Sequence, residues 1–324
     1  MIEVGDCMKE AMYYKVKGNS IYCELCPRYC KINDGETGKC RVRKHIKGKL
    51  YALGYGRLVS AHVDPIEKKP LYHFYPKSDI LSVGFSSCNM TCPFCQNYEL
   101  SQSVYEVEEV SIERLMSYVD FGIAFTYNEP LINYEYIYEF SKRLKALSPD
   151  KKIVLVTNGM INQAPLEELL NYVDAINLDF KGLSNFYKFC GGNYDTLVKN
   201  LKLMNKVHLE VTTLMVTGSV DLEAIKVISK VIADVNPKIP FHLSRYFPQY
   251  LSEAPATDLA LMTSAKLIAS ENLEYVYLGN IGEEQNTYCT NCHQLLIQRY
   301  RFNAEIKYIS CPCGYDNNIR SKNE

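Results

Sequence analysis

The chain is predicted to fold as an α/β protein built around a partial (β/α) barrel, with a small cysteine-rich module on either side. From residue 80 onward, short apolar, β-branched runs alternate with longer segments whose apolar residues recur at helical spacing. Polar residues directly follow several of these runs, at the strand ends where β/α barrels carry their catalytic groups. Cysteine clusters before and after this region predict the two modules.

The chain divides into four predicted segments. A cysteine-rich N-terminal metal-binding module is expected over residues 1–50, and a β-rich connector over 51–79. The barrel is expected over 80–282, and a zinc-ribbon-like module with a polar tail over 283–324. The tail after Tyr315 is expected to fray because it is polar and terminal.

Seven runs in the barrel region have the length and composition of buried strands: 80–85, 122–127, 153–157, 175–178, 207–215, 241–243 and 275–278. The intervening segments with helical periodicity are 111–118, 131–147, 163–172, 197–205, 222–232 and 256–270. Because each helix-like segment follows a strand-like run, we expect a parallel sheet.

Charge and hydropathy argue against several classes of partner. The 324 residues carry a formal net charge of -1, which gives no electrostatic reason to expect nucleic acid or an anionic membrane. The sequence has no apolar run of about eighteen residues, and its first residues lack a basic start followed by an apolar core. We therefore expect a soluble, cytoplasmic protein.

Of the thirteen cysteines, eleven fall in three clusters, which predicts metal ligation rather than disulfide bonding in a chain of this size. Cys7 and Cys190 lie outside the clusters and are expected to be ordinary thiols. Cys88, Cys92 and Cys95 form the central cluster, spaced C-x3-C-x2-C directly after a strand-like run. Three thiolates leave one iron of a [4Fe-4S] cluster without a protein ligand. A zinc knuckle or a chance cluster is the alternative.

The central cysteines, with Phe94 before the last of them, resemble the cluster motif of the radical S-adenosylmethionine (SAM) superfamily. The resemblance implies a [4Fe-4S] cluster whose open iron is chelated by the amino and carboxylate groups of SAM. It also implies reductive cleavage of SAM to a 5′-deoxyadenosyl radical, which abstracts a hydrogen atom from a substrate. An electron donor such as flavodoxin or ferredoxin is implied as a partner.

Thr126-Tyr-Asn-Glu-Pro130 follows the second strand-like run. Members of the superfamily often carry Gly-Gly-Glu-Pro at this place, in a loop that binds the amino group of SAM. The resemblance therefore implies a SAM-binding role for Asn128 and Glu129, although this chain has Tyr127 and Asn128 where the motif has two glycines. A helix N-cap followed by proline is the alternative.

Later strand ends carry further polar residues. Asn158 follows the third run within Thr-Asn-Gly, and Asp179 with Lys181 follows the fourth. Activating enzymes of glycyl radical enzymes carry similar residues at matching strand ends and a histidine that corresponds to His242, which implies SAM contacts here. A simple ion pair explains Asp179 and Lys181 equally well. Arg245, close to His242, suits a carboxylate, phosphate or adenosyl group.

The fifth strand-like run has one polar side, formed by His208, Glu210 and Thr212. In a barrel this side is expected to face SAM or substrate. An edge strand with one solvated face is the alternative.

The two outer cysteine clusters each offer four thiolates. The C-terminal cluster has a zinc-ribbon layout, which predicts a closed structural zinc site at Cys289, Cys292, Cys311 and Cys313. The N-terminal cluster fits a structural zinc and an auxiliary [4Fe-4S] cluster equally well, and consists of Cys23, Cys26, Cys30 and Cys40. An auxiliary cluster would offer an electron relay or an anchor for substrate.

Together with Cys-Glu-Leu-Cys-Pro at 23–27 and Asp-Pro-Ile-Glu-Lys-Lys-Pro at 64–70, these motifs resemble the radical SAM enzyme of the AmmeMemoRadiSam system, which is related to pyruvate formate-lyase activating enzymes. The expected function is oxidoreductase chemistry: hydrogen abstraction from an unidentified substrate, with a protein as one candidate. Activation of a glycyl radical enzyme is the first alternative. The second is a zinc-ribbon binding protein on a barrel scaffold.

Overall fold

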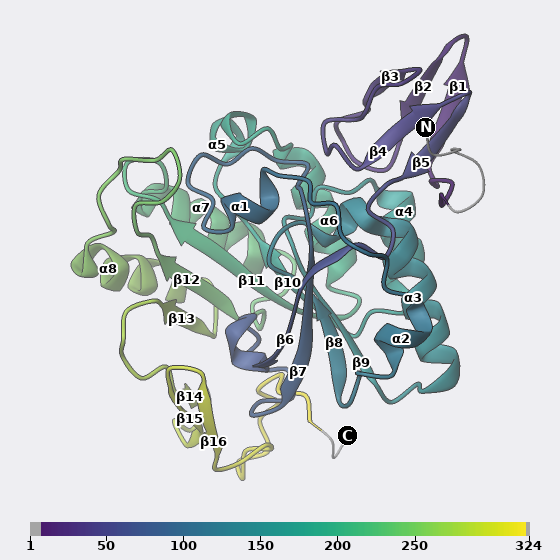
Figure 1. The fold of residues 1–324 in the computed structure, drawn as a ribbon. Coiled ribbons are helices and arrows are strands. Elements are labelled where there is room, and N and C mark those ends of the chain that lie inside the picture. The colour runs from purple at the N-terminus through teal and green to yellow at the C-terminus, as the bar shows by residue number, and fades with distance from the viewer. Residues whose placement is uncertain (1–7, 322–324) are drawn as a thin grey trace.

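The computed structural model describes residues 8–321. Over these residues the largest element is an eight-stranded sheet in the order β13-β12-β11-β10-β9-β8-β7-β6 (Figure 1). Its strands are β6 (Leu58–Pro65), β7 (Asp79–Phe85), β8 (Gly122–Phe125), β9 (Lys152–Thr157), β10 (Ala175–Asp179), β11 (His208–Met215), β12 (Phe241–Arg245) and β13 (Val276–Gly279). Because β6 and β13 are not paired with each other in the described chain, the barrel is open.

Strands β7 to β13 are parallel to their neighbours, and β6 runs antiparallel to β7. All the strands predicted for the barrel region are present, with ends that differ from the prediction by two residues at most. Their near-continuous apolar sequences suit them to a parallel sheet that is covered on both faces, as in β8, where every residue is buried. The predicted α/β partial barrel is confirmed.

Helices follow the strands and cover the outer face of the sheet in Figure 1. They are α1 (Tyr98–Ser101), α2 (Ile112–Met116), α3 (Tyr134–Leu147), α4 (Gln163–Leu170), α5 (Ser184–Phe189), α6 (Tyr194–Met204), α7 (Leu222–Ala233) and α8 (Leu259–Ser270), with 3-10 helices η1 (Ile66–Lys68) and η2 (Pro130–Asn133). The sequence did not predict α1 and α5, which are too short to show helical periodicity. Within residues 8–321, no helix has the length and apolar character needed to cross a membrane.

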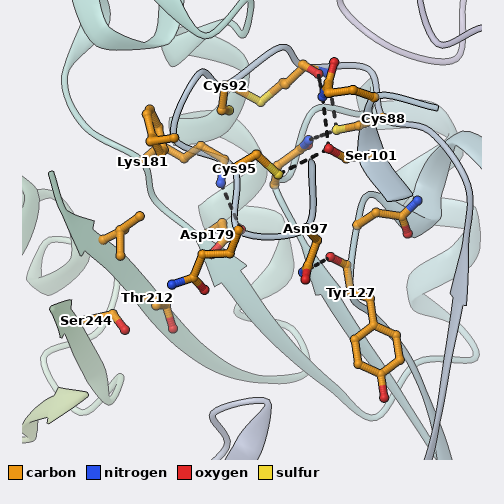
Figure 2. A pocket seen from close by; sticks show the side chains of 17 residues that line it. Cys88, Cys92, Cys95, Asn97, Ser101, Tyr127, Asp179, Lys181, Thr212 and Ser244 are labelled. Atoms are coloured by element: carbon orange, nitrogen blue, oxygen red, sulfur yellow. Dashed lines mark hydrogen bonds and ion pairs between the residues drawn. The ribbon is translucent and has the colours of Figure 1, made fainter. Parts of the chain in front are cut away.

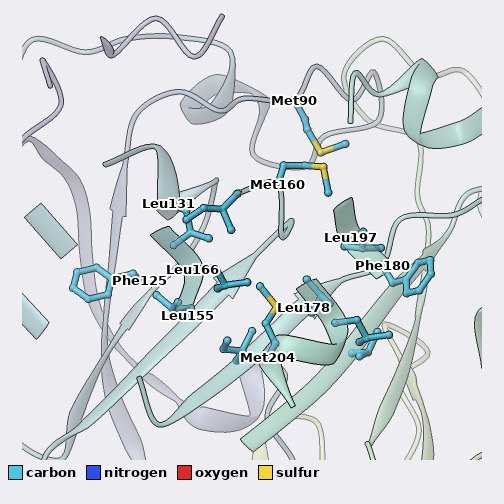
Figure 3. Close-up of a cluster of buried hydrophobic side chains, with 14 of the residues drawn as sticks. Met90, Phe125, Leu131, Leu155, Met160, Leu166, Leu178, Phe180, Leu197 and Met204 are labelled. Atoms are coloured by element: carbon cyan, nitrogen blue, oxygen red, sulfur yellow. The ribbon is translucent and has the colours of Figure 1, made fainter. Parts of the chain in front are cut away.

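Buried apolar side chains join the sheet to its helices (Figure 3). Leu155 and Leu178 come from the strands, and Leu166, Leu197 and Met204 come from the helices; all five have no measurable exposure. This layer also fixes the turn after β9, because a side chain at Gly159 would lie 2.7 Å from the Cδ1 atom of Leu178. Gly159 has a φ of +71°, which favours glycine, so the core sets the position of the preceding residue at the strand end.

The N-terminal module consists of two small antiparallel sheets at the upper right of Figure 1. Their strands are β1 (Tyr14–Lys17), β2 (Ser20–Cys23), β3 (Lys31–Asn33), β4 (Arg43–Ile46) and β5 (Lys49–Ala52). Arg43 forms a 3.0 Å ion pair with Glu135 of α3, and both side chains are almost completely buried. The module is therefore anchored to the outer helices of the barrel by a pair whose disruption would leave a buried charge.

The predicted connector is more closely integrated with the barrel than the sequence suggested, because β6 lies within it and forms the antiparallel edge of the sheet. The tail, expected to fray, instead packs against the connector over its described part. The N–H of Arg320 donates to the carbonyl oxygen of His73 at 2.7 Å, and the N–H of Tyr75 donates to the carbonyl oxygen of Arg320 at 2.9 Å. These main-chain hydrogen bonds hold the tail in place.

The C-terminal module is a three-stranded antiparallel sheet of β14 (Thr287–Tyr288), β15 (Leu295–Tyr300) and β16 (Asn303–Ile306), at the lower left of Figure 1. Its anchor is Arg299, which is fully buried and donates hydrogen bonds to the carbonyl oxygen of Tyr72 and to Thr287. The guanidinium also lies over the Tyr72 ring, 4.5 Å from its centre. The connector thus lies between the barrel and this module.

Candidate active site

A cavity of about 200 Å³ lies at the carboxyl ends of the barrel strands (Figure 2). It is lined by loops that follow β7, β8, β9 and β10, so parallel pairing brings together residues that are far apart in the sequence. Seven of the ten residues predicted for the central cluster and for SAM line it: Cys88, Cys92, Cys95, Asn128, Asn158, Asp179 and Lys181.

Each of the three cysteines is held by a different contact. The N–H of Met90 donates to the Cys88 sulfur at 3.3 Å, and the Ser101 hydroxyl lies 3.2 Å from the Cys95 sulfur. The thiol of Cys190 hydrogen-bonds to Cys92, which lowers the pKa of Cys92 despite its burial. Burial raises the pKa of Cys88 and of Cys95. The loop therefore orients three sulfurs into one cavity.

The spacing of these sulfurs suits a body larger than one metal ion. Within residues 8–321, the four C-terminal cysteines form a group whose ligand atoms all lie within 4.8 Å of one another. Cys88, Cys92 and Cys95 do not form such a group. A tetrahedral zinc ion with thiolate ligands holds its sulfurs about 3.8 Å apart. Three thiols that share a cavity at wider spacing fit an iron–sulfur cluster with one iron free of protein ligands.

Lys181 places a buried positive charge beside the cysteines. Its ammonium group forms a 3.0 Å ion pair with Asp179 (Figure 2). Burial opposes this charge, but Asp179 and Cys92 raise the pKa of Lys181 well above its ordinary value. The two residues thus form the ion pair that the sequence offered as the alternative, and they also line the cavity, while their contact with SAM stays a prediction.

Tyr127 takes the backbone conformation that a glycine of the superfamily motif would adopt. Its φ is +71°, and its hydroxyl donates to Asp64 at 2.9 Å. The ring packs so closely on Gly84 that a side chain there would lie 2.8 Å from it. The departure from the motif is therefore accommodated by a glycine on the neighbouring strand and by a hydrogen bond that Tyr127 donates to the connector.

Glu129 does not line the cavity, although the motif implied contact with SAM. Its carboxylate accepts hydrogen bonds from the N–H of Leu131 at 3.0 Å, the hydroxyl of Thr157 at 2.8 Å and the N–H of Asn158 at 2.7 Å. Burial raises the pKa of Glu129 to about 7, against the effect of these donors. The side chain acts as the helix N-cap that the sequence offered as the alternative, and it also ties the β9 turn to the β8 turn.

Asn128 and Asn158 do line the cavity. The Asn128 amide donates to the carbonyl oxygens of Phe85 and Ser87, while its Oδ1 atom is buried and has no partner among the described residues. The Asn158 amide lies 3.6 Å from the Cys88 sulfur and 3.0 Å from the Oδ1 atom of Asn89. One asparagine therefore offers an unpaired acceptor, and the other a donor next to a cysteine.

His242 and Arg245 do not reach the cavity. Side chains alternate along β12, so His242 and Ser244 share the inner face while Arg245 lies on the other. The Arg245 guanidinium donates to the carbonyl oxygen of Thr257 at 2.8 Å and covers the Phe247 ring. His242 hydrogen-bonds to Glu210 at 2.7 Å.

The polar side of the fifth strand is buried inside the barrel, and the edge-strand interpretation is wrong because β11 lies between β10 and β12. Glu210 accepts hydrogen bonds from His208, from His242, and from the main-chain N–H groups of Tyr72 and His73. Burial alone would raise the pKa of Glu210, but the two histidines bring it below its usual range. This carboxylate fastens the connector to the barrel, and Thr212 is the residue of this side that lines the cavity.

A second cavity of about 400 Å³ shares Gln96 and Ser244 with the first. His242 lines it from β12, and Arg301 with Phe302 line it from the C-terminal module. The sequence pointed to none of the loop residues Gln96, Asn97 and Gln102 that line the first cavity. The one feature of the sequence that could have indicated these residues is their position directly after the cysteine motif.

The sulfurs of the C-terminal cysteines lie close together, as predicted for a site that binds a single metal ion. The sulfurs of Cys289 and Cys313 lie 3.6 Å apart, and the Cys292 and Cys311 sulfurs lie 3.4 Å apart. These spacings fit a tetrahedral tetrathiolate site with sulfurs about 3.8 Å apart. Two of the cysteines are buried, and two are exposed at the module surface.

Comparison with known proteins agrees with this geometry. A model of the Radical SAM superfamily matches residues 83–230. An uncharacterized protein of Methanocaldococcus jannaschii, MJ0808, is 40% identical over 316 residues, which cover 92% of this chain and 94% of that protein. The 7-carboxy-7-deazaguanine synthase of the same organism is 25% identical over 179 residues, covering 47% of this chain and 70% of that enzyme.

Among solved structures, a domain of a pyruvate-formate lyase-activating enzyme from Bacteroides vulgatus is similar with a TM-score of 0.43 and 17% identity, covering 50% of this chain and 100% of that one. SuiB of Streptococcus suis, solved with bound S-adenosylmethionine, gives a TM-score of 0.47 and 17% identity over 60% of this chain and 48% of that one. The superfamily match spans the cysteine loop and the strand ends of the cavity. This chain therefore contains a domain of the radical SAM superfamily, and over almost its whole length it belongs to one family with MJ0808.

Proposed function

We propose that Cys88, Cys92 and Cys95 bind a [4Fe-4S] cluster, and that the cavity beside them binds SAM. When bound, a cluster with one open iron supplies the electron that cleaves SAM to a 5′-deoxyadenosyl radical. The observation that carries this proposal is the convergence of the three cysteines with Asn128, Asn158 and the Asp179–Lys181 pair around one cavity. Hydrogen abstraction makes the enzyme an oxidoreductase.

Asn128 is the residue that we assign to the SAM amino group. Its buried Oδ1 atom has no donor within residues 8–321, and an ammonium group would supply one. Glu129 then supports this contact indirectly, because its carboxylate holds the N–H of Asn158 and the start of η2. Lys181 is the cation available for the SAM carboxylate.

The second cavity is our candidate for the substrate space. It borders the first cavity at Gln96 and Ser244, so a substrate there would lie next to SAM bound in that cavity. His242 is held by Glu210 with its ring facing this space. Arg301 and Phe302 cover it, which gives the C-terminal module, with zinc as its proposed metal, a role in shaping the substrate site.

An apolar rim supports a protein as the substrate. This rim is formed by the exposed side chains of Tyr250 and Leu251, with Phe189, which stacks on Phe186 next to Phe94 of the cysteine loop. Tyr250 stacks on Tyr98 of α1 with ring centres 4.7 Å apart, and the N–H of Leu251 donates to the carbonyl oxygen of Pro93 within the cysteine loop. Exposed apolar side chains grouped around an active site are typical of a surface that receives another protein.

Activation of a glycyl radical enzyme is the second candidate, since the same rim would receive a glycine-bearing loop. The proposal also assigns the protein to the AmmeMemoRadiSam system and places it in a reducing cytoplasm. Its proposed electron donor is a flavodoxin or a ferredoxin. The cysteines within the described residues are free thiols, which a reducing compartment would preserve. Membranes and nucleic acids are not partners in this proposal.

The first test is SAM cleavage by anaerobically reconstituted protein with dithionite. We expect 5′-deoxyadenosine and methionine from the wild type and none from the Cys88→Ala/Cys92→Ala/Cys95→Ala variant. Cys292→Ser, in the C-terminal module, is the control for loss of a thiol elsewhere. Turnover that survives in the triple variant would exclude the proposed cluster site.

The second test identifies the class of substrate. Extract from cells grown on deuterated amino acids is separated into a protein fraction and a small-molecule filtrate, and deuterium in 5′-deoxyadenosine is measured with each. We expect transfer from the protein fraction, with a persistent glycyl doublet in electron paramagnetic resonance (EPR) only if an activase is at work. Leu251→Glu is expected to reduce transfer, while Leu267→Glu, equally exposed at 68% but on α8, leaves it intact. Transfer from the filtrate alone would contradict a protein substrate.

A further inference from the structure

The four N-terminal cysteines gather at one place in their module. Cys23 ends β2, Cys26 and Cys30 lie in the turn that follows, and Cys40 precedes β4. Burial raises the pKa of Cys26 to about 12, and the other three cysteines act on it in the same direction. The N–H of Cys23 also donates to the carbonyl oxygen of Cys30 at 3.0 Å, and the N–H of Lys39, next to Cys40, donates to the Cys30 sulfur, so the backbone brings these cysteines together.

Main-chain N–H groups are aimed at all four sulfurs. Lys39 donates to Cys30 at 3.4 Å, and the donors for Cys23, Cys26 and Cys40 are the N–H groups of Leu25, Arg28 and Val42. Such contacts stabilise the charged thiolate over the neutral thiol. Burial has the larger effect and raises the pKa of Cys23, Cys26 and Cys40, so a cation bound by the sulfurs would be needed to hold them as thiolates.

Arg43 gives this cluster a counter-charge. The side chain is 1% exposed, and its positive charge lowers the pKa of both Cys23 and Cys40, against the effect of burial. Two of its guanidinium nitrogens bond to Glu135 and to the carbonyl oxygen of Met12, but its Nε atom has no partner among residues 8–321. An unpaired donor on a buried cation beside four thiols fits a bound group with negative charge, such as a tetrathiolate metal centre.

The spacing of the sulfurs separates zinc from an iron–sulfur cluster. Among the described residues, the C-terminal cysteines lie within the 4.8 Å that a single ion requires, with neighbouring sulfurs 3.3 to 3.6 Å apart. The N-terminal four do not meet that spacing, and neither do Cys88, Cys92 and Cys95. The described residues thus contain one quartet whose sulfurs lie as close together as a single ion requires, and a second quartet with a wider spacing, which suits a bound group larger than one ion.

The N-terminal cysteine loop also touches the active-site loop at two points. The Ser87 hydroxyl, one residue before Cys88, donates to the carbonyl oxygen of Cys40 at 2.7 Å. The Arg41 guanidinium donates to the carbonyl oxygen of Ser101 at 2.7 Å, and the hydroxyl of Ser101 lies 3.2 Å from the Cys95 sulfur. Two short paths of covalent and hydrogen bonds therefore run from Cys40 to two cysteines of the active site.

We propose that Cys23, Cys26, Cys30 and Cys40 bind a second [4Fe-4S] cluster that passes electrons through the Cys40–Ser87 and Arg41–Ser101 contacts to the active-site cluster. The electron-transfer part of this proposal rests on the proposed function, whereas the identity of the bound group does not. In the step, one electron leaves a low-potential carrier protein, reduces the N-terminal cluster and then the active-site cluster. No bond is made or broken, and no proton is transferred.

The surface charge of the module identifies the class of carrier. Residues 8–50 contain eleven Lys or Arg and four Asp or Glu, a balance of +7 in a chain whose net charge is -1. Lys31 and Lys39 are exposed and lie next to Cys30 and Cys40. A positive surface over a redox site attracts an acidic one-electron carrier of the ferredoxin or flavodoxin class.

Metal and spin analysis of the anaerobically purified full chain tests the cluster. We expect about eight irons in the wild type and about four, as [4Fe-4S] in the Mössbauer spectrum, in the Cys88→Ala/Cys92→Ala/Cys95→Ala variant. The EPR signal of that variant is expected not to respond to SAM. A triple variant that holds zinc at the N-terminal site and no iron would overturn the proposal. If the triple variant does not fold, the wild type decides: two clusters, of which SAM shifts one, support the proposal, and one cluster excludes it.

The relay is tested by changing the electron donor. Cys26→Ala/Cys30→Ala is expected to keep SAM cleavage within about twofold when dithionite and a viologen supply electrons, and to lose roughly tenfold or more when reduced flavodoxin does. Equal losses with both donors would exclude a relay. A wild type that does not cleave SAM with either donor would instead refute the proposed function, and the iron count of the triple variant would still stand.

A variant with reversed surface charges tests whether electrons enter through the N-terminal module. Lys31→Glu/Lys39→Glu is expected to lower the rate of reduction by flavodoxin about tenfold at low salt, and this difference from the wild type is expected to shrink as salt is added. Lys226→Glu, exposed on α7, is the matched control. Both variants should hold the same number of irons. Equal rates for the two variants would contradict entry of electrons through the N-terminal module.

Discussion

The hydroxyl of Ser87 donates a 2.7 Å hydrogen bond to the carbonyl oxygen of Cys40, a residue 47 positions earlier in the chain. The same hydroxyl accepts hydrogen bonds from the Arg41 guanidinium at 2.9 and 3.1 Å. Ser87 is fully buried and has a φ of +76°, a conformation that is unfavourable for serine. Its contacts across the two cysteine loops hold it there.

Ser87→Ala is therefore expected to lower the free energy of unfolding by about 1–3 kcal/mol, because it leaves a buried carbonyl and a guanidinium without their partner. The measurement is urea unfolding of the anaerobic, metal-loaded protein. Ser141→Ala is the matched control, since Ser141 has a buried hydroxyl with no partner in the described residues and its removal should cost little. Equal losses in the two variants would show that the Cys40 contact is not stabilising.

His73 gives a prediction for pH. Its ring hydrogen-bonds to the carbonyl oxygen of Asn317 and to the hydroxyl of Tyr277, at 3.0 and 2.7 Å. Burial lowers its pKa to about 3, and the nearby charges of Glu210 and Arg299 act in opposite directions. Below pH 6.5 the unfolded chain binds a proton at this histidine, whereas the folded protein does so only near pH 3, so stability falls as the pH decreases across this window.

When the pH is lowered from 7.5 to 5, the unfolding free energy of the wild type should fall by about 2 kcal/mol more than that of the His73→Gln variant. Urea unfolding of both proteins at the two pH values measures the difference. Both proteins share the pH dependence of metal binding. It therefore cancels when the change in unfolding free energy between the two pH values is compared for the two proteins. Equal changes in unfolding free energy for the wild type and the variant would mean that burial does not hold His73 neutral.

The fold was predictable because parallel strands covered on both faces leave a strong signal. Runs such as Ile153 to Thr157 are apolar at nearly every position and are followed by a helix of clear periodicity. A β-rich connector was predicted, but the place of its strand β6 in the main sheet and the order of the tail depend on tertiary contacts. β6 has an exposed, mixed sequence that only pairing with β7 makes a strand, and the tail is ordered by main-chain bonds to the connector.

The lining of the cavity was predictable where polar or thiol groups directly follow a strand, as for the three central cysteines and for Asp179 with Lys181, whereas the roles of these residues stay predictions. It was not predictable where orientation decides. Glu129 lies in the expected loop, but its carboxylate turns to the main chain of the next turn. Arg245 was expected to bind the cofactor beside His242, but side chains alternate along β12, so Arg245 lies on the opposite face from His242.

The C-terminal metal site is expected to be structural. Removal of its metal by a chelator, or Cys311→Ser, should unfold the module locally, because the module contains few buried side chains besides the cysteines. Hydrogen exchange should then show loss of protection in β14 to β16, with β8 to β10 unchanged. Thr290→Ala, within the same loop, is the control for a change of side chain without loss of a ligand. Loss of protection throughout the barrel would contradict a local role.

Cys190 is predicted to set the potential of the active-site cluster. It is fully buried, and its thiol donates a hydrogen bond to the sulfur of Cys92. Donors to the sulfur ligands favour the reduced state of an iron–sulfur cluster, because they stabilise added negative charge. Cys190→Ala removes the donor and should lower the midpoint potential on the order of 50 mV, close to a tenfold change in the one-electron equilibrium. An EPR-monitored redox titration measures the shift.

Cys190→Ser separates the hydrogen bond from the volume of the side chain. A serine hydroxyl is smaller than a thiol but still donates, so this variant should stay close to the wild-type potential while the alanine variant falls below it. The iron content of both should match the wild type, because Cys190 lies beside the Cys92 ligand and is not proposed to bind iron itself. If the two variants shift the potential equally, packing around Cys92 and not the donated hydrogen bond controls the cluster.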